Sequence, residues 1–141
     1  MASAPQDSIF TRIIRGEIPC HRVFENDRLL AFLDIRPLAD GHTIVVPKRQ
    51  VEFLEDLPPE DAAEIGRQLG RIARRVVQAT GAEGYNILQN NGKAAGQEIP
   101  HVHFHIIPRR RGDGLGYRWQ ARPADPQALG ELARRINACD A

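Results

Sequence analysis

Residues 58–81 carry the longest amphipathic pattern in the chain and constrain the fold more than any other segment. Apolar side chains recur there at steps of three and four, the spacing of a helix with one buried face. Acidic side chains open the segment and Gly81 follows it, as dipole and capping preferences favour. The predicted apolar stripe consists of Ala62, Ile65, Leu69, Ile72, Ala73, Val76 and Val77. A helix of this kind buries its stripe against another layer of structure.

Five short segments rich in β-branched and aromatic residues are predicted to be strands, and two shorter helices accompany them. Asn26 and Asp27 separate the first two segments and indicate a hairpin turn. The predicted strands are residues 21–26, 29–35, 41–48, 85–90 and 101–108, and the shorter helices are residues 8–15 and 125–138. This order predicts an α+β fold: a five-stranded antiparallel sheet with the long helix and a C-terminal helix.

Length and composition indicate one globular domain. A chain of 141 residues is ordinarily a single domain, here residues 1–141 with a loose leader at 1–7 and a helical extension at 121–141. A net charge of +1 gives no general attraction to nucleic acid or to an anionic membrane. The sequence has no secretion signal and no long apolar run, and its two cysteines are far apart. We therefore predict a cytoplasmic protein with no nucleic-acid or membrane partner.

Three of the five histidines, His101, His103 and His105, stand at alternate positions. Side chains two residues apart in a strand share one face, so the histidines share a face and the apolar residues between them take the other. The apolar set is predicted to pack beneath the long helix, and the histidine set to meet solvent or a ligand. His21 and His42 have no evident partner in the sequence, which gives them no predicted role.

The histidine row has three competing explanations. A polar outer face would be served equally well by serine or lysine. A metal site would use the commonest protein ligand, but neighbours about 7 Å apart along a strand converge poorly on a tetrahedral ion. Catalysis on an anion suits the pattern better, because one imidazole attacks phosphorus while others donate hydrogen bonds to the phosphate oxygens. The glycine-containing loop at 90–97 is suited to bring backbone N–H groups to the same anion.

Four stretches carry a resemblance to a known family: "SIFTRIIRGEIP", "AFLDIRPLADGHTIVVPK", "GYNILQNNGKAAGQ" and "GQEIPHVHFHIIPR". In order and spacing they resemble the histidine-triad (HIT) family, and within it the nucleotide-binding branch called Hint. The likeness covers roughly residues 8–120. It implies an antiparallel sheet with two helices, a homodimer, and a purine nucleotide or nucleotide derivative as ligand, without a cofactor.

The resemblance also implies roles for individual residues. His103 would be the nucleophile that forms a covalent nucleotidyl intermediate, and His101 and His105 would orient it and the α-phosphate. Gln97 is placed with this catalytic group, as a polar contact near the phosphate. The remaining nucleotide contacts are implied for Asp34 at the ribose, for Asn90 near the phosphate, and for Ile9, Phe10, Ile13 and Phe32 at the purine.

Three departures from the family pattern bear on the site. Many bacterial relatives bind zinc through C-x-x-C and two histidines, and three of those four positions here are Ser8, Thr11 and Gln50. The loss of three ligands together predicts no metal. Gln50 also replaces a histidine that often approaches the phosphate, so a neutral amide would contact the nucleotide there. Glu98 stands where animal relatives carry a serine, and Trp119 lies in a stretch that in relatives reaches toward the partner's site.

The predicted function is hydrolysis or transfer at the α-phosphate of purine nucleoside monophosphate derivatives, through a nucleotidyl-histidine intermediate. Phosphoramidates are the favoured substrates, because a P–N bond breaks readily once its nitrogen is protonated. Two alternatives stay open: cleavage of dinucleoside polyphosphates, and a nucleotide-binding regulatory protein with little turnover. The sequence carries no feature that decides the leaving group.

Overall fold

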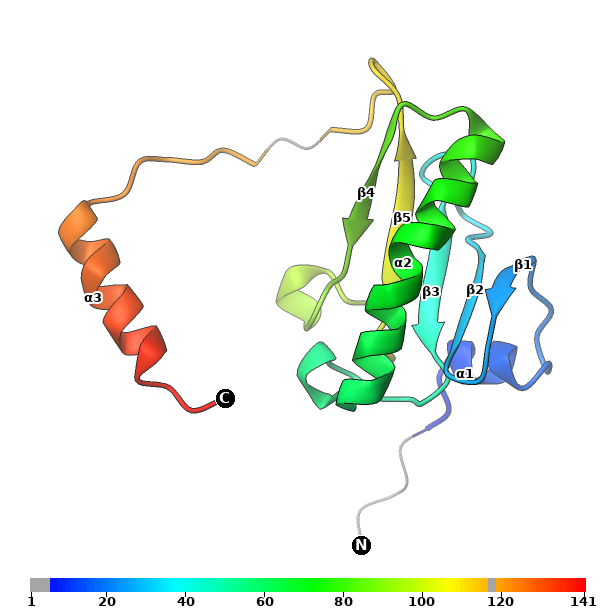
Figure 1. Cartoon of the computed structure of the whole chain (residues 1–141), viewed down its shortest axis with the longest axis horizontal. Coiled ribbons are helices and arrows are strands. Elements are labelled where there is room, and N and C mark those ends of the chain that lie inside the picture. Colours follow the sequence, from blue (N-terminus) through cyan, green and yellow to red (C-terminus); the bar gives the residue numbers. More distant parts are fainter. Residues whose placement is uncertain (1–5, 117–118) are drawn as a thin grey trace, which may run out of the picture.

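The computed structural model describes residues 6–116 and 119–141. Residues 1–5 of the predicted leader lie outside the described residues. Five strands form one sheet in the order β1-β2-β3-β5-β4, with every neighbouring pair antiparallel. They are β1 (Arg22–Glu25), β2 (Leu29–Leu33), β3 (Thr43–Pro47), β4 (Gly84–Leu88) and β5 (Phe104–Arg109). The predicted α+β fold is confirmed, and β5 lies inside the sheet between β3 and β4 (Figure 1).

The long helix α2 (Pro59–Thr80) lies across one face of the sheet (Figure 1). Its buried side chains pack on a cluster to which β2, β3 and the histidine segment all contribute. That cluster includes Leu29, Ala31, Val45, Ile65, Ile72, Ala73, Val76, Val102 and Ile106. Val102 and Ile106 come from the positions between and after the histidines, so the predicted packing of the apolar set beneath the long helix is confirmed.

The first turn of α2 differs from the predicted stripe, because Ala62 is exposed and Asp61 is buried. Arg28 Nη1 donates to Asp61 Oδ1 at 2.6 Å, and Arg49 Nε donates to Asp61 Oδ2 at 3.1 Å. Burial acts to raise the pKa of the Asp61 carboxyl, but the hydrogen bonds from the two guanidinium groups outweigh it and lower that pKa. The buried carboxylate therefore ties the β1–β2 turn and the end of β3 to the helix.

The opposite face of the sheet is covered at one end by the short helix α1 (Ile9–Ile14). Ser8 caps this helix, since its hydroxyl oxygen accepts from Thr11 N at 3.0 Å. Phe10 is buried against Phe32, with ring centroids 5.8 Å apart, in a second cluster that contains Leu30, Ile44 and Val46. Alternation along β2 and β3 explains the division, since neighbouring residues of one strand point into different clusters.

Gly41 brings the connection between β2 and β3 against the end of α2. Its φ is 90°, and a Cβ atom there would lie 2.7 Å from Thr80 Cγ2 and 3.2 Å from Val76 Cγ1. Only glycine adopts this backbone conformation freely and leaves room for the helix. The next residue is His42, so the close approach also fixes where β3 begins.

The C-terminal helix α3 (Pro126–Asn137) stands away from the sheet (Figure 1). Asp125 caps it by accepting from Ala128 N, and none of its residues is buried. Leu129, Leu132 and Ile136 form an uncovered apolar face. Two single turns of 3₁₀ helix complete the described elements, η1 (Leu54–Asp56) and η2 (Lys93–Ala95). Within the described residues, no helix has the length and apolar character needed to cross a bilayer.

Candidate active site

The histidine segment enters the sheet later than predicted. Strand β5 begins at Phe104, so His105 lies in the strand while His101 and His103 belong to the extended segment before it. In that segment Val102 N donates to Val51 O at 2.8 Å, so the chain pairs with the connection after β3 instead of with β3 itself. Side-chain alternation nevertheless continues through both parts, and the three histidines remain on the face opposite α2.

The histidine face is more enclosed than the sequence predicted. His101 is 0% exposed and His103 is 8% exposed, because α1 covers them. The Phe10 ring lies 5.7 Å from the His101 ring and 4.9 Å from the His103 ring, edge to face in both cases. His105 is partly exposed, with its ring 5.0 Å from that of His103. The expected contact with solvent is therefore wrong for His101, whose side chain belongs to the interior.

The position of the proton on His103 follows from a hydrogen bond to a main-chain carbonyl. His103 Nδ1 lies 2.7 Å from the carbonyl oxygen of His101. A carbonyl oxygen only accepts, so Nδ1 carries the proton, and in the neutral ring Nε2 keeps its lone pair. Burial lowers the pKa of His103, opposed by that carbonyl and by Asp34, so the ring is neutral at neutral pH. The middle histidine thus presents an unprotonated nitrogen.

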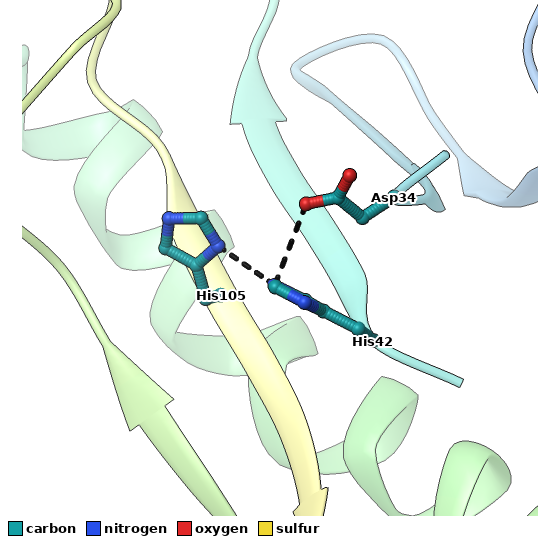
Figure 2. A group of neighbouring side chains, drawn as sticks. All are labelled: Asp34, His42 and His105. Atoms are coloured by element: carbon teal, nitrogen blue, oxygen red, sulfur yellow. Dashed lines mark hydrogen bonds and ion pairs between the residues drawn. The ribbon is translucent and has the colours of Figure 1, made fainter. Parts of the chain in front are cut away.

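His105 has the opposite arrangement, set by His42 (Figure 2). Leu38 N donates to His42 Nδ1 at 3.1 Å, so the neutral His42 ring carries its proton on Nε2. His42 Nε2 lies 2.9 Å from His105 Nδ1 and donates to it. The proton of neutral His105 is therefore on Nε2. The Nε2 atoms of these adjacent imidazoles therefore differ: His103 Nε2 has a free lone pair, and His105 Nε2 carries a proton that it can donate.

His42 is the functional residue that the sequence did not reveal. In the sheet, Ile44 is directly opposite His105, so His42, two residues earlier, shares the face of His105. That relation depends on the register between β3 and β5, which one sequence does not specify. The ring contact of His42 with His105 is close, with centroids 5.1 Å apart.

Asp34 lies beside this pair, from the segment after β2 (Figure 2). Its Oδ1 accepts from Arg36 N at 2.8 Å, and its Oδ2 lies 3.7 Å from His42 Nε2. The ligand atoms of Asp34, His42 and His105 all lie within 4.8 Å of one another, so among the described residues this group could hold a cation. It offers three ligands, two of them already hydrogen-bonded to each other. The absence of a metal stays a prediction.

The residues predicted to contact the purine and the residue predicted to contact the phosphate have different surroundings. Phe10 and Phe32 are buried, Ile13 packs against the same cluster, and Ile9 is exposed one turn before it on α1. Asn90 makes no side-chain hydrogen bond to any other described residue, which leaves its amide available to a ligand.

Gln97, predicted to contact the phosphate, is buried and holds its own loop together. Its Oε1 accepts from Gly92 N at 2.7 Å, and its Nε2 donates to Glu52 O at 2.8 Å and to Ile99 O at 3.1 Å. The next residue, Glu98, is exposed. Both atoms of the Gln97 amide are thus used within the protein, and its effect on the phosphate would act through the loop at 92–97.

Gln50 and Trp119 also have defined surroundings. The side-chain amide of Gln50 bonds to the start of the chain, through Gln6, Ser8 and Thr11. Trp119 is 81% exposed and borders a cavity of about 330 Å³ on the histidine face of the sheet. The cavity lies beyond His105 and is lined by Leu38, Asn86, Leu88, Ile107, Arg109, Leu115, Gly116 and Trp119.

Comparison with known proteins identifies the family of the chain. The HIT domain family matches residues 15–112, and the chain belongs to that family. It is 40% identical to an adenosine 5'-monophosphoramidase of Schizosaccharomyces pombe, over 92% of this chain and 96% of that protein. It is 45% identical to an adenylylsulfatase of Arabidopsis thaliana, over 77% of this chain and 55% of that protein. A HIT family structure from Bacillus subtilis superposes with a TM-score of 0.90 and 37% identity, covering 96% of this chain and 99% of that one.

Acid is expected to destabilise the fold through the buried His42, His101 and His103 and the half-buried His105. Burial lowers the pKa of His42, His101, His103 and His105, the last to about 4. The unfolded chain, with histidine pKa values near 6.5, binds more protons than the folded chain between about pH 6.5 and pH 4. The free energy of unfolding should therefore fall as the pH drops from about 7 to about 4. Urea titrations across this range measure it, and a free energy independent of pH there would contradict the expectation.

Proposed function

We propose that the protein hydrolyses purine nucleoside monophosphate derivatives at the α-phosphate, through a nucleotidyl-histidine intermediate on His103, with phosphoramidates as the preferred substrates. The chain is an enzyme of the hydrolase class, as its relatives of about 40% identity are. The observation that carries the proposal is the pair of adjacent imidazoles with opposite protonation. The Nε2 lone pair of His103 is a nucleophile, and the Nε2–H of His105 is a donor to a phosphate oxygen.

The proposed first step forms a bond from His103 Nε2 to the α-phosphorus and breaks the bond to the leaving nitrogen. The amine departs with the bonding electron pair and takes up a proton from solvent. The ring of His103 becomes positively charged, and its Nδ1–H stays hydrogen-bonded to the His101 carbonyl, which stabilises that charge. In the second step water attacks the same phosphorus and loses a proton to solvent, the bond from phosphorus to His103 Nε2 breaks with its electron pair returning to the ring, and the nucleoside monophosphate leaves neutral His103 behind.

The surroundings of the triad supply sites for the rest of a nucleotide. The Asp34 carboxylate is suited to accept from two vicinal ribose hydroxyls. Its Oδ2 makes no hydrogen bond within the described residues and lies 3.7 Å from His42 Nε2. Ile9 and Ile13 would provide apolar surface for a purine, with the buried Phe10 and Phe32 behind them. Asn90 and the loop at 92–97 would approach the phosphate. The same chemistry would serve a substrate with a sulfate leaving group. The Arabidopsis relative is named as an adenylylsulfatase, which supports this extension.

The proposal is tested with substrates that share the adenylyl group and differ in the leaving group. A fluorogenic adenosine phosphoramidate, adenylyl sulfate and a diadenosine polyphosphate are compared by kcat/KM. We expect the phosphoramidate to be hydrolysed fastest. A higher value for the polyphosphate would move the function to that branch of the family. If none reacts while AMP binds in calorimetry, the protein is a nucleotide-binding regulator and the proposal is wrong.

Replacement of Asp34 by Asn is expected to raise KM about tenfold, because the carboxylate oxygen that would accept from the ribose hydroxyls becomes an amide NH2 group, which only donates. The amide keeps an oxygen to accept from Arg36 N, so the local turn is preserved. The measurement uses the ribose substrate and its 2',3'-dideoxy analogue. The wild type should discriminate between them, and Asp34→Asn should not. Equal discrimination by both proteins would place the ribose elsewhere.

We also propose that the protein works in the cytoplasm as a homodimer, without nucleic-acid or membrane partners. The family resemblance implies the dimer, and two uncovered apolar surfaces support it. Tyr85 and Ile87 are exposed on the edge strand β4, and Leu129 and Ile136 are exposed on α3. Light scattering after size-exclusion chromatography should give twice the chain mass, and a monomer mass at every protein concentration would contradict the proposal.

A further inference from the structure

We propose that Ser8, Thr11 and Gln50 form a hydrogen-bonded network that positions the catalytic histidines, by holding His101 in one tautomer and one orientation. The proposal rests on the hydrolase function above, in which the His101 carbonyl fixes the protonation of His103. None of these three side chains touches His103 directly in the described hydrogen bonds, so they are positioning residues.

The contact at the centre of the network joins Ser8 to His101. Ser8 Oγ lies 2.7 Å from His101 Nδ1, and both residues are buried, with exposed fractions of 6% and 0%. On its other side, His101 Nε2 lies 2.9 Å from the carbonyl oxygen of Pro47. That carbonyl only accepts, so Nε2 carries the proton and Nδ1 must accept from the Ser8 hydroxyl. His101 is thus fixed at both nitrogens.

The Ser8 hydroxyl is directed to His101 by a second layer of contacts. Its oxygen already accepts from Thr11 N at 3.0 Å, which orients the hydroxyl. Gln50 Oε1 accepts twice, from Ser8 N at 2.9 Å and from Thr11 Oγ1 at 2.5 Å, and Gln50 Nε2 donates to Gln6 O at 2.9 Å. The amide therefore holds both ends of the first turn of α1. Among the described residues no buried side-chain nitrogen or oxygen lacks a partner, and this network is complete.

The network affects the nucleophile, His103, in two ways. The backbone carbonyl of His101 is the acceptor for His103 Nδ1–H, so a displacement of the main chain at His101, once its ring is no longer held, would release the proton that keeps Nε2 of His103 free. Phe10 stands between Ser8 and Thr11 in the chain, and its ring packs on both histidine rings. A network that fixes the first turn of α1 therefore fixes the neighbour of both rings as well. Partners that orient a catalytic imidazole have large effects without touching the substrate.

A purely structural role for Ser8, as the cap of α1, predicts a different result. Helix capping requires only the oxygen of Ser8 as acceptor, whereas positioning requires its hydroxyl as donor to His101. Aspartate at position 8 keeps the cap and, when ionised, has no proton to donate to His101. Threonine keeps both the acceptor and the donor. The three variants Ser8→Ala, Ser8→Asp and Ser8→Thr therefore separate the two roles.

The first experiment measures kcat and KM of the wild type and these variants with the adenosine phosphoramidate, with folding followed by circular dichroism. Ser8→Ala and Ser8→Asp should lower kcat about 10- to 100-fold and leave KM within about twofold. Ser8→Thr should restore most of the activity. If Ser8→Asp folds and keeps the wild-type kcat, the positioning role is overturned and Ser8 is only a cap.

Thr11 supplies a second, independent pair of variants in case the Ser8 variants do not fold. Thr11→Val removes the hydroxyl at nearly constant volume, and Thr11→Ser keeps it. Thr11→Val should lower kcat and Thr11→Ser should not, because only the hydroxyl bonds to Gln50. Equal kcat values for the two would overturn the proposal for this part of the network.

The second experiment does not depend on activity. Ring ¹⁵N chemical shifts distinguish a protonated from an unprotonated imidazole nitrogen, and they should show His101 protonated at Nε2 and His103 at Nδ1. In Ser8→Ala the His101 and His103 signals should shift or broaden. Unchanged signals would overturn the network even in an active enzyme, whereas a wild type with these shifts and no hydrolysis would refute the proposed function alone.

Discussion

A His103→Ala variant is expected to lose hydrolysis of the adenosine phosphoramidate, with kcat lowered about 10³-fold or more. The side chain carries the lone pair that attacks phosphorus, and its proton is fixed away from the substrate by the His101 carbonyl. Within the triad no other nitrogen has this arrangement, since His105 presents N–H at Nε2 and both nitrogens of His101 are bonded inside the protein.

The matched control for this variant is His21→Ala, which removes an exposed imidazole. It should leave kcat and KM unchanged, because no part of the mechanism uses His21. Both variants are checked by circular dichroism, and mass spectrometry after acid quenching tests for the nucleotidyl enzyme in the wild type. A folded His103→Ala variant with activity within tenfold of the wild type would show that another group, or water directly, attacks the phosphorus.

A Gly41→Ala variant is expected to lose about 2–5 kcal/mol of the free energy of unfolding. The backbone φ of 90° is unfavourable for a residue with a Cβ atom, at about 1–2 kcal/mol. The new methyl group would lie 2.7 Å from Thr80 Cγ2 and 3.3 Å from Pro108 Cγ, so the end of α2 must move away, which adds about 1–3 kcal/mol. Urea denaturation followed by circular dichroism measures the loss.

The control substitution, Gly70→Ala, is expected to change the free energy of unfolding in the opposite direction. Gly70 lies inside α2, is exposed, and has no neighbour within 4 Å of the position where a Cβ would be. Gly70→Ala should therefore raise the free energy of unfolding by about 1 kcal/mol, through helix propensity alone. Equal effects of the two substitutions would show that the clash at Gly41 is relieved without cost. A displacement of the backbone at Gly41 should also shift the next residue, His42. The kcat of the Gly41→Ala variant is therefore expected to fall along with its stability.

The fold was predictable because each element follows from local pattern. The alternation of Val102, Phe104 and Ile106 placed these side chains beneath the long helix, and the structure buries Val102 and Ile106 there. The pattern failed where a charge network outweighs hydrophobic periodicity. Ala62 continues the apolar stripe, yet Asp61 takes the buried position because two arginines from distant segments reach it. Contacts between distant segments are not encoded in periodicity.

The site was predictable only in part, for the same reason. A spacing of two put the three histidines on one face, but His42 joined them through the register of β3 on β5. Covering of His101 by α1 likewise depends on how the helix docks, so the interior position of that ring had no sequence signal. Side chains whose function depends on a neighbour across the sheet become visible only when the sheet is assembled.

Main-chain atoms place the protons of three imidazoles in this site, those of His42, His101 and His103. The carbonyl of His101, the carbonyl of Pro47 and the N–H of Leu38 each fix one ring nitrogen. Every amino acid has a backbone carbonyl, and every one except proline has a backbone N–H. Evolution is therefore free to exchange the side chains at positions 38 and 47 while the imidazole tautomers are inherited unchanged. A sequence alignment compares side chains and does not record main-chain hydrogen bonds. Two homologues with different residues at these positions can therefore share one protonation pattern.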